Sequence, residues 1–211
     1  MKRHSVSIVI LLLVLISSFS QAQEMQTLFK GARSSGGYAA LSNKFTAIDG
    51  EYANMVELYG GWFINKRFLL GVGGAATTNY IDVPEEFSTL PGASMSYGYG
   101  QFGLVTEYVF GSNKAVHLNF TMLSGAGFTF QYMRPRWNEW DTYDHVDNYD
   151  SDENFFFVIE PGVQLEMNVF KWMRFSPGVS YRKTFGSDAE GLDDDALANV
   201  SYNLTLKFGK F

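Results

Sequence analysis

The stretch that most constrains the fold is residues 155–182, in which apolar and polar side chains alternate over two long arms joined at residues 170–172. Successive side chains of a β-strand point to opposite faces, so the pattern predicts a hairpin with one apolar and one polar face. Each arm is long enough to cross a bilayer, which takes about 9–11 residues of tilted strand. A soluble sheet that buries its apolar face would show the same alternation, so the hairpin alone leaves both interpretations open.

The first residues indicate export. Lys2 and Arg3 precede an apolar run at residues 6–16, and small residues follow it. This pattern predicts a secretory signal peptide at residues 1–22 and a mature outer-membrane β-barrel domain at residues 23–211. The run is shorter than the roughly 20 residues of a transmembrane helix. The chain has no cysteine, which excludes lipoprotein processing and disulfide stabilisation.

The composition favours a membrane barrel over a nucleic-acid-binding protein. The formal net charge is −6, and removal of Lys2 and Arg3 with the signal peptide makes it more negative. A chain this acidic is an unlikely partner for nucleic acid. Aromatic residues make up 17% and charged residues only 18% of the sequence, which also holds 21 glycines. Alternating, aromatic- and glycine-rich sequence of this kind is typical of a transmembrane barrel.

The same alternation recurs along the chain and predicts an all-β fold, an eight-stranded antiparallel up-and-down transmembrane β-barrel. The predicted strands are 36–45, 54–64, 68–78, 96–110, 116–133, the two arms of 155–182, and 199–208. Three connections are short: 65–67, 111–115 and 170–172. The connections at 79–95, 134–154 and 186–196 are long and polar. Outer-membrane barrels combine short periplasmic turns with long extracellular loops.

Aromatic side chains flank both ends of the predicted strands, as two interfacial girdles require. Those beside the short turns are Trp62, Phe68, Tyr108, Phe110, Phe170, Trp172 and Phe208. Those towards the long loops are Tyr80, Phe128, Phe130, Tyr132, Phe155 and Tyr181. A soluble lipocalin-like barrel predicts no such girdles. Pro161 and Pro177 each remove a hydrogen-bond donor from a paired strand, and we expect a local bulge at each.

Several blocks of the sequence resemble small outer-membrane β-barrel proteins of Bacteroidetes-type bacteria. These blocks are GGYAALSNKFTAIDGEY, YGGWFIN, GYGQFGLVTEYVFGSNKAVH, VIEPGVQLEMNVFKWMRFSPGVSYR and LKFGKF. The resemblance spans nearly the whole mature chain and rests on structural motifs, so it implies a fold and a location. The family has no assigned chemistry to carry over. Phe211 is similar to the C-terminal aromatic residue read by the barrel-insertion machinery, although it falls on the opposite parity from Phe208.

The polar face of the strands carries charged residues that we expect to point into the barrel. This predicted lumen charge network consists of Glu57, Glu107, Glu160, Glu166, Arg174, Arg182 and Lys207. An eight-stranded barrel is just wide enough for side chains to fill, and buried charges must be paired. A salt-bridged plug is therefore favoured over a proton or ion path.

The hairpin allows two registers, and each predicts a different ion pair. If Val169 lies opposite Met173, then Glu160 faces Arg182. If Asn168 lies opposite Trp172, then parity allows Glu166 to face Arg174 instead. In either register a carboxylate meets a guanidinium inside the barrel.

The loop at residues 134–154 is a candidate binding surface because it combines aromatic, arginine and acidic residues. Its candidate residues are Arg134, Arg136, Trp137, Trp140, Asp141, Asp144, Asp147 and Asp150. Residues 150–154 resemble the opening of a calcium loop, but Phe155 stands where glycine is required and no glutamate follows at the twelfth position. We therefore predict a solvated acidic loop and no metal site, with loose binding of a divalent cation by the loop carboxylates, or a bridge to lipopolysaccharide through one, as the alternative. The expected partners are outer-membrane lipid and lipopolysaccharide, the barrel-insertion machinery during assembly, and a protein partner at the extracellular loops.

No catalytic residue or cofactor is predicted, so the favoured function is a non-enzymatic barrel that acts through its loops or supports the envelope. An outer-membrane enzyme acting on lipid or peptide is the alternative, with His145 oriented by Asp144 or Asp147. No motif in the sequence identifies a serine nucleophile that would act with His145. A small passive pore is less favoured because the lumen should be filled.

Overall fold

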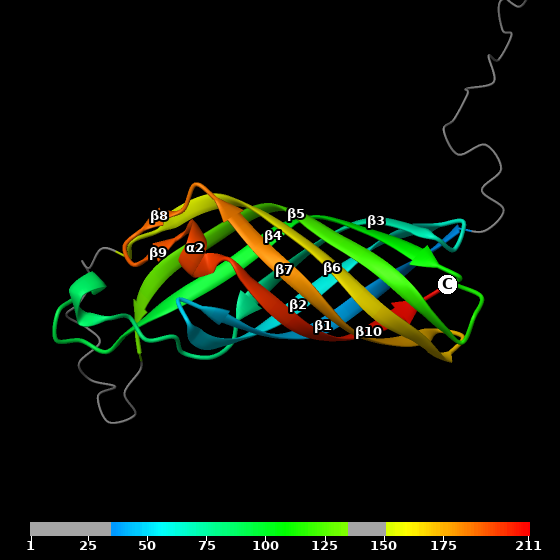
Figure 1. Ribbon diagram of the computed structural model, residues 1–211, viewed down its shortest axis with the longest axis horizontal. Helices are drawn as coiled ribbons and strands as arrows, with labels where there is room; N and C mark the ends of the chain where they lie inside the picture. Colours follow the sequence, from blue (N-terminus) through cyan, green and yellow to red (C-terminus); the bar gives the residue numbers. More distant parts are fainter. Residues whose placement is uncertain (1–34, 135–150) are drawn as a thin grey trace, which may run out of the picture. The chain divides into compact units, whose positions relative to one another are not determined.

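The computed structural model describes residues 35–134 and 151–211, in which eight strands close into an antiparallel barrel (Figure 1). The predicted signal peptide lies outside the described residues. Each strand pairs with its neighbours along the chain, and β10 pairs with β1 to close the sheet. The predicted fold class is confirmed. The barrel strands are β1 (Ser35–Ile48), β2 (Glu51–Ile64), β3 (Phe68–Thr77), β4 (Met95–Phe110), β5 (Val116–Met133), β6 (Asn154–Phe170), β7 (Met173–Phe185) and β10 (Asn199–Gly209).

The two faces of the strands separate as the alternation predicts. The outer face is apolar and open: Leu58, Trp62 and Val72 are each at least 63% exposed. The inner face holds the polar residues, and Glu166 and Lys207 are fully buried. Monomeric water-soluble proteins rarely expose continuous apolar surface on this scale. The outer face is therefore suited to lipid, in which a closed barrel leaves no backbone group unpaired.

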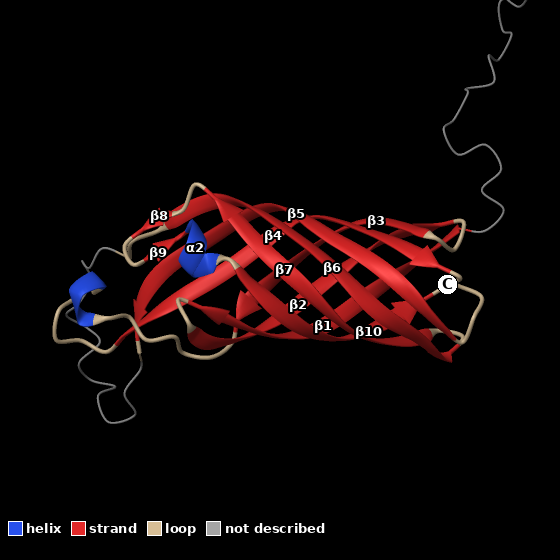
Figure 2. Ribbon diagram, in the orientation of Figure 1, coloured by secondary structure: helices blue, strands red, loops and turns tan. Residues whose placement is uncertain are grey.

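One end of the barrel, here called the short-turn end, carries three tight connections (Figure 2). Asn65 and Lys66, between β2 and β3, both have positive φ, 53° and 58°. Two consecutive residues of that kind form the turn whose twist matches a hairpin. The C-terminus also lies at this end (Figure 1). Aromatic residues surround it: Phe170 stacks on Trp172 at 5.5 Å between ring centroids.

The opposite end, here called the loop end, is more ordered than the sequence suggests. The predicted loop at 186–196 contains a two-stranded sheet of β8 (Asp188–Ala189) and β9 (Leu192–Asp193), followed by α2 (Asp194–Leu197). The loop between β3 and β4 includes a short 3₁₀ helix, η1 (Glu85–Phe87). None of the helices in the described residues is long and apolar enough to span a membrane.

Side chains from these loops seal the loop end. Leu192 and Leu197 pack with Ile81 and with Tyr97 and Tyr99 of β4 in one buried apolar cluster. We call this cluster the apolar lid. It forms because the connection after β7 folds back over the barrel mouth and buries its few leucines there, and Tyr97 donates a hydrogen bond to the Glu190 carbonyl oxygen at 3.0 Å.

The prediction of a local bulge at each of the two prolines is wrong. Pro161 pairs in register with Met122, and Pro177 pairs in register with Leu204. The register shift between β6 and β7 lies instead at residues 168–170, beside the turn. A proline lacks only one N–H, so the sheet loses a single ladder bond at each and keeps its register.

Candidate functional site

The candidate site is the barrel interior, where charged side chains from six strands are buried together. The described residues bury four carboxylates and four lysine or arginine side chains inside the barrel. Removing such charges from water is costly unless each is paired. The buried carboxylates are Glu57, Glu107, Glu160 and Glu166, and the buried cations are Lys44, Arg174, Arg182 and Lys207.

The first group of charges, the loop-side ion cluster, is centred on Lys44 of β1. Its Nζ lies 2.8 Å from Glu57 Oε1 and 2.9 Å from Glu160 Oε1. Glu160 also accepts hydrogen bonds from Gln101 at 2.6 Å and Ser180 at 2.5 Å. One amine therefore pairs with two carboxylates, and two neutral donors add further hydrogen bonds to Glu160.

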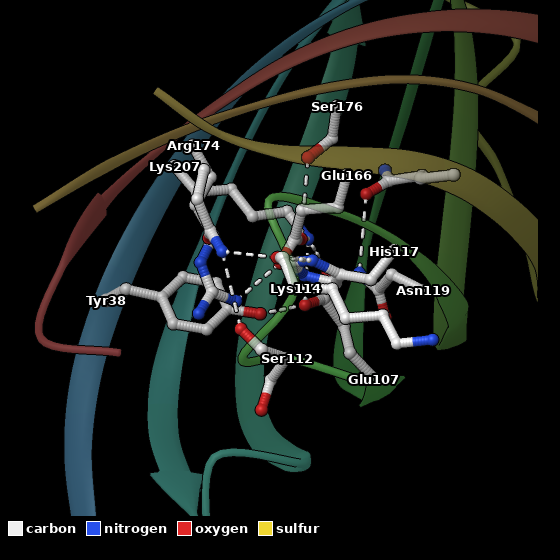
Figure 3. A network of polar contacts seen from close by, with 12 residues as sticks. Tyr38, Glu107, Ser112, Lys114, His117, Asn119, Glu166, Arg174, Ser176 and Lys207 are labelled. Carbon is white, nitrogen blue, oxygen red and sulfur yellow. Dashed lines mark hydrogen bonds and ion pairs between the residues drawn. The ribbon is translucent and has the colours of Figure 1, made fainter. Parts of the chain in front are cut away.

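The second group, the turn-side ion cluster, is centred on Lys207 of β10 (Figure 3). Its Nζ lies 3.0 Å from both oxygens of Glu107 and 2.7 Å from Glu166 Oε2. Tyr38 and Tyr59 both donate to Glu107, the latter at 2.7 Å. Arg174 donates to the second oxygen of Glu166. Every carboxylate oxygen in this cluster thus has a charged or hydroxyl donor.

The predicted ion pair between Glu160 and Arg182 is wrong, although the register that suggested it is correct. Ile159 pairs with Lys183, the register that sets Glu160 opposite Arg182. Arg182 instead donates to the carbonyl oxygens of Leu197 at 2.7 Å and Ala47 at 3.0 Å. Its guanidinium also lies 4.6 Å from the centroid of the Tyr99 ring. Its long side chain reaches the loop end and ties α2 to the barrel.

The other predicted pair, between Glu166 and Arg174, does form, but not in the register that predicted it. Asn168 lies opposite Arg174, not opposite Trp172, so Glu166 and Arg174 are diagonal neighbours and not directly opposed. A diagonal neighbour is within reach of long side chains. Arg174 and Glu166 therefore pair inside the barrel in a register that was not expected to bring them together.

Sequence reasoning missed Lys44 as the centre of one cluster and His117 as a member of the other. Lys44 falls in a strand whose pattern is weak, although its parity with Ser42 and Thr46 would have placed it inside. His117 Nε2 lies 2.8 Å from Glu166 Oε1, and its Nδ1 lies 3.1 Å from the Lys114 carbonyl oxygen. These two contacts hold the imidazole beside the turn-side ion cluster, near the short-turn end of the barrel.

Little space remains in the interior. A cavity of about 20 Å³ lies between the two ion clusters, bordered by Lys44, Glu57, Tyr59 and Glu107. That volume is enough for about one water molecule. The apolar lid closes the loop end above it. At the short-turn end Phe211 packs on Tyr38 and Phe63, with ring centroids 5.1 Å and 6.3 Å apart.

The predicted loop binding surface is represented in the structure by one residue. Arg134 forms an ion pair with Asp82 and lies 5.3 Å from the centroid of the Tyr80 ring. The other seven candidates lie outside the described residues, and these are Arg136, Trp137, Trp140, Asp141, Asp144, Asp147 and Asp150. His145 also lies outside them. Within residues 35–134 and 151–211 no three His, Asp or Glu side chains gather as a metal site would require.

No protein-family model matches this sequence, and no curated protein matches it. Among solved structures the barrel is similar to neisserial surface protein A, with a TM-score of 0.51 at 12% identity over 84% of this chain and 97% of that one. Two others are a major outer membrane protein from Thermus thermophilus and Ail, the attachment invasion locus protein of Yersinia pestis. The first gives a TM-score of 0.47 at 9% identity and the second 0.43 at 16%, covering 83% of this chain in each case and 99% and 97% of those chains. The similarity to neisserial surface protein A identifies the fold, a closed eight-stranded antiparallel barrel.

Proposed function

We propose that this protein is a non-enzymatic outer-membrane barrel with a closed interior, which acts through its loop end or as a structural component of the envelope. The observation that carries the proposal is the interior itself. Two ion clusters fill it, and apolar side chains close both of its ends. A barrel of this kind presents its loops to one side of the membrane while the body transmits no solute.

The outer face supports the proposed location. It is apolar along every strand and bounded by aromatic residues at both ends, such as Trp62 near the short turns and Phe155 near the loops. The pattern at residues 1–22 supports export. The resemblance of the sequence blocks to Bacteroidetes-type barrels favours that group of bacteria as the source. We assign the short turns to the periplasmic side of the membrane and the acidic loops to the outside, which is the usual orientation of outer-membrane barrels.

The closed interior argues against the pore. Lys44 alone holds two carboxylates within 2.9 Å, and the nearest free space has room for about one water molecule. An ion crossing the barrel would have to break these pairs and displace Leu192 and Leu197 of the apolar lid. Neither step is compatible with steady conduction.

Planar bilayer recordings on the refolded protein test the closed interior. We expect no discrete conductance at moderate voltage, with insertion verified independently by heat-modifiable migration on a gel. Discrete, voltage-stable channels from the inserted protein would overturn the proposal in favour of a pore.

A pull-down from native outer membrane tests the role of the loops. The wild-type barrel and a variant with residues 135–150 replaced by a short Gly-Ser linker form the matched pair. A protein or lipopolysaccharide retained only by the wild type supports a binding role at the loop end. Equal recovery by both favours the structural role. A loop-dependent hydrolytic activity on lipid or peptide would favour an enzyme instead.

A further inference from the structure

The two ends of the barrel differ in charge. Each short turn carries a cation, and the residue before the C-terminus adds another: Lys66 and Arg67, Lys114, Lys171 and Lys210. The carboxylates nearest this end among the described residues, Glu107 and Glu166, are buried and paired. The loop end is the reverse, with exposed acids that include Asp188, Asp193 and Asp195.

A pocket of about 630 Å³ opens at the short-turn end between the three turns. The residues that line it include Lys66, Lys171, Asn113, Asn168, Arg174 and Phe211. No aspartate or glutamate side chain lines it. Lysine amines and asparagine amides are donor groups of the kind that an oxyanion needs.

Arg174 provides a second sign that this pocket is built for a ligand. Its side chain is 3% exposed, and one terminal nitrogen donates to Glu166. The ring centroid of Phe211 lies 3.8 Å from the guanidinium carbon. Its Nε is buried and has no hydrogen-bond partner among the described residues. A buried donor left without a partner is costly, and a ligand or water in the adjoining pocket would relieve that cost.

The hairpin turn between β2 and β3 sets the backbone conformation of Lys66. Its φ of 58° lies in the left-handed region, where glycine and asparagine are favoured and a long side chain is uncommon. Lys66 is one of the residues that line the pocket, and glycine would suit its backbone conformation.

The position of the pocket beside the aromatic girdle, at the level of the lipid headgroups, indicates the class of ligand. Lys171 lies between Phe170 and Trp172, which are 54% and 56% exposed on the outer face, and Phe170 also lines the pocket. Aromatic residues of such a girdle sit at the level of lipid headgroups. We propose that this pocket binds the phosphate of an anionic phospholipid headgroup, with Lys66 and Lys171 as its cationic ligands. The inference rests on the proposed membrane location.

Native mass spectrometry of the barrel, released from vesicles containing equal amounts of phosphatidylglycerol and phosphatidylcholine, tests this binding. We expect a bound phosphatidylglycerol on the wild type. The variant Lys66→Gly/Lys171→Gln should lose about 25-fold in lipid preference, because each lysine at an anionic surface contributes about fivefold. Glycine suits the conformation at residue 66, so the variant should fold. Lys183→Gln/Lys210→Gln removes two cations outside the pocket and should retain the lipid.

The outcomes separate this inference from the location on which it rests. Failure of the wild type to insert into vesicles would overturn the proposed location. Insertion with no preference for phosphatidylglycerol, or with equal loss in both variants, would overturn the lipid site alone. In a third arm soluble glycerol phosphate competes for the pocket. Complete displacement of the lipid at micromolar glycerol phosphate would identify a free phosphate ligand and contradict the proposal.

Discussion

Two lysine amines organise the interior, because each of them pairs with two carboxylates. Lys207 bridges Glu107 and Glu166, and Lys44 bridges Glu57 and Glu160. A lysine offers three N–H donors from one compact charge, which allows several acceptors to converge on it. Tyrosine, serine and glutamine side chains donate further hydrogen bonds to these carboxylates, and Glu166 also pairs with Arg174.

Removal of one such amine should therefore lower the stability of the barrel more than removal of the amine together with one of its carboxylates. Lys207→Met leaves Glu107 and Glu166 facing each other without their shared cation, and we expect a loss of about 3–5 kcal/mol in the free energy of unfolding. The double variant Lys207→Met/Glu107→Gln should recover part of that loss. Urea titrations of the barrel in vesicles measure both. Simple additivity of the two single changes would mean that the pair is not coupled.

Asp194 gives the loop end a dependence on pH. Partial burial acts to raise the pKa of its carboxyl, but the backbone N–H groups of Gly186 and Ser187 donate to it and hold the pKa below its ordinary value of 3.8. The carboxylate therefore contributes stability above pH 3.8, and the contribution disappears as the pH falls through the lowered pKa.

NMR of the amide protons of Gly186 and Ser187 measures this dependence. We expect both signals to shift with a midpoint below 3.8, and Asp194→Asn to abolish the titration. Asp195→Asn is the control, since Asp195 pairs with the exposed Lys183 instead. A midpoint at or above the ordinary value would contradict the assigned contacts.

At the scale of whole strands, the alternation of side chains was sufficient to predict the barrel. The eight strands and the inward orientation of the seven predicted lumen residues follow from period two, because successive side chains point to opposite faces. The partners inside the lumen could not be predicted in the same way. Lys44 reaches Glu160 across 116 positions of sequence, and that contact depends on how strands far apart in the chain face each other.

The ends of the strands were the least predictable part. The connection at 186–196 reads as a polar loop, yet three apolar residues in and beside it, Ala189, Leu192 and Leu197, fold into the barrel mouth. Arg182 determines this arrangement by donating to the Leu197 carbonyl oxygen, a backbone acceptor that carries no signal in the sequence.

Loss of Arg182 should loosen the lid before it loosens the barrel. Arg182→Met removes the hydrogen bonds to Leu197 and Ala47 but keeps much of the side-chain volume. We expect faster proteolysis within residues 188–197 and little change in the urea midpoint of the barrel. Lys114→Met, in the exposed turn between β4 and β5 at the short-turn end, removes a lysine far from the lid and should leave the proteolysis rate unchanged. Equal rates for the two variants would show that Arg182 does not hold the lid.

The outer face of β5 and β6 should respond to charge according to depth. Phe120→Arg in the middle of the apolar face should cost about 2–4 kcal/mol of folding free energy in a bilayer. Phe155→Arg, at the start of β6 beside the loops, should cost only about 0–1 kcal/mol. Refolding titrations in lipid vesicles compare the two. Similar costs at both positions would mean that the apolar face does not follow the membrane.

The whole barrel combines an apolar outer face, an interior whose four carboxylates are matched by four lysine or arginine side chains, and two ends of different charge. The short-turn end carries lysines among aromatic residues, and the loop end carries acids above a buried lid. A lipid bilayer explains each of these features at once, since it requires the apolar face, excludes unpaired charge from the body and distinguishes the two sides.

Spin labels placed singly along residues 118–122 of β5 test this claim most directly, because the chain has no cysteine and each label site is unique. In bilayers, labels at Leu118, Phe120 and Met122 should be accessible to dissolved oxygen and shielded from a water-soluble nickel chelate. Labels at Asn119 and Thr121 should be shielded from both. This alternation of period two is the predicted result. Nickel access at Leu118, Phe120 and Met122, or no alternation at all, would contradict the membrane barrel.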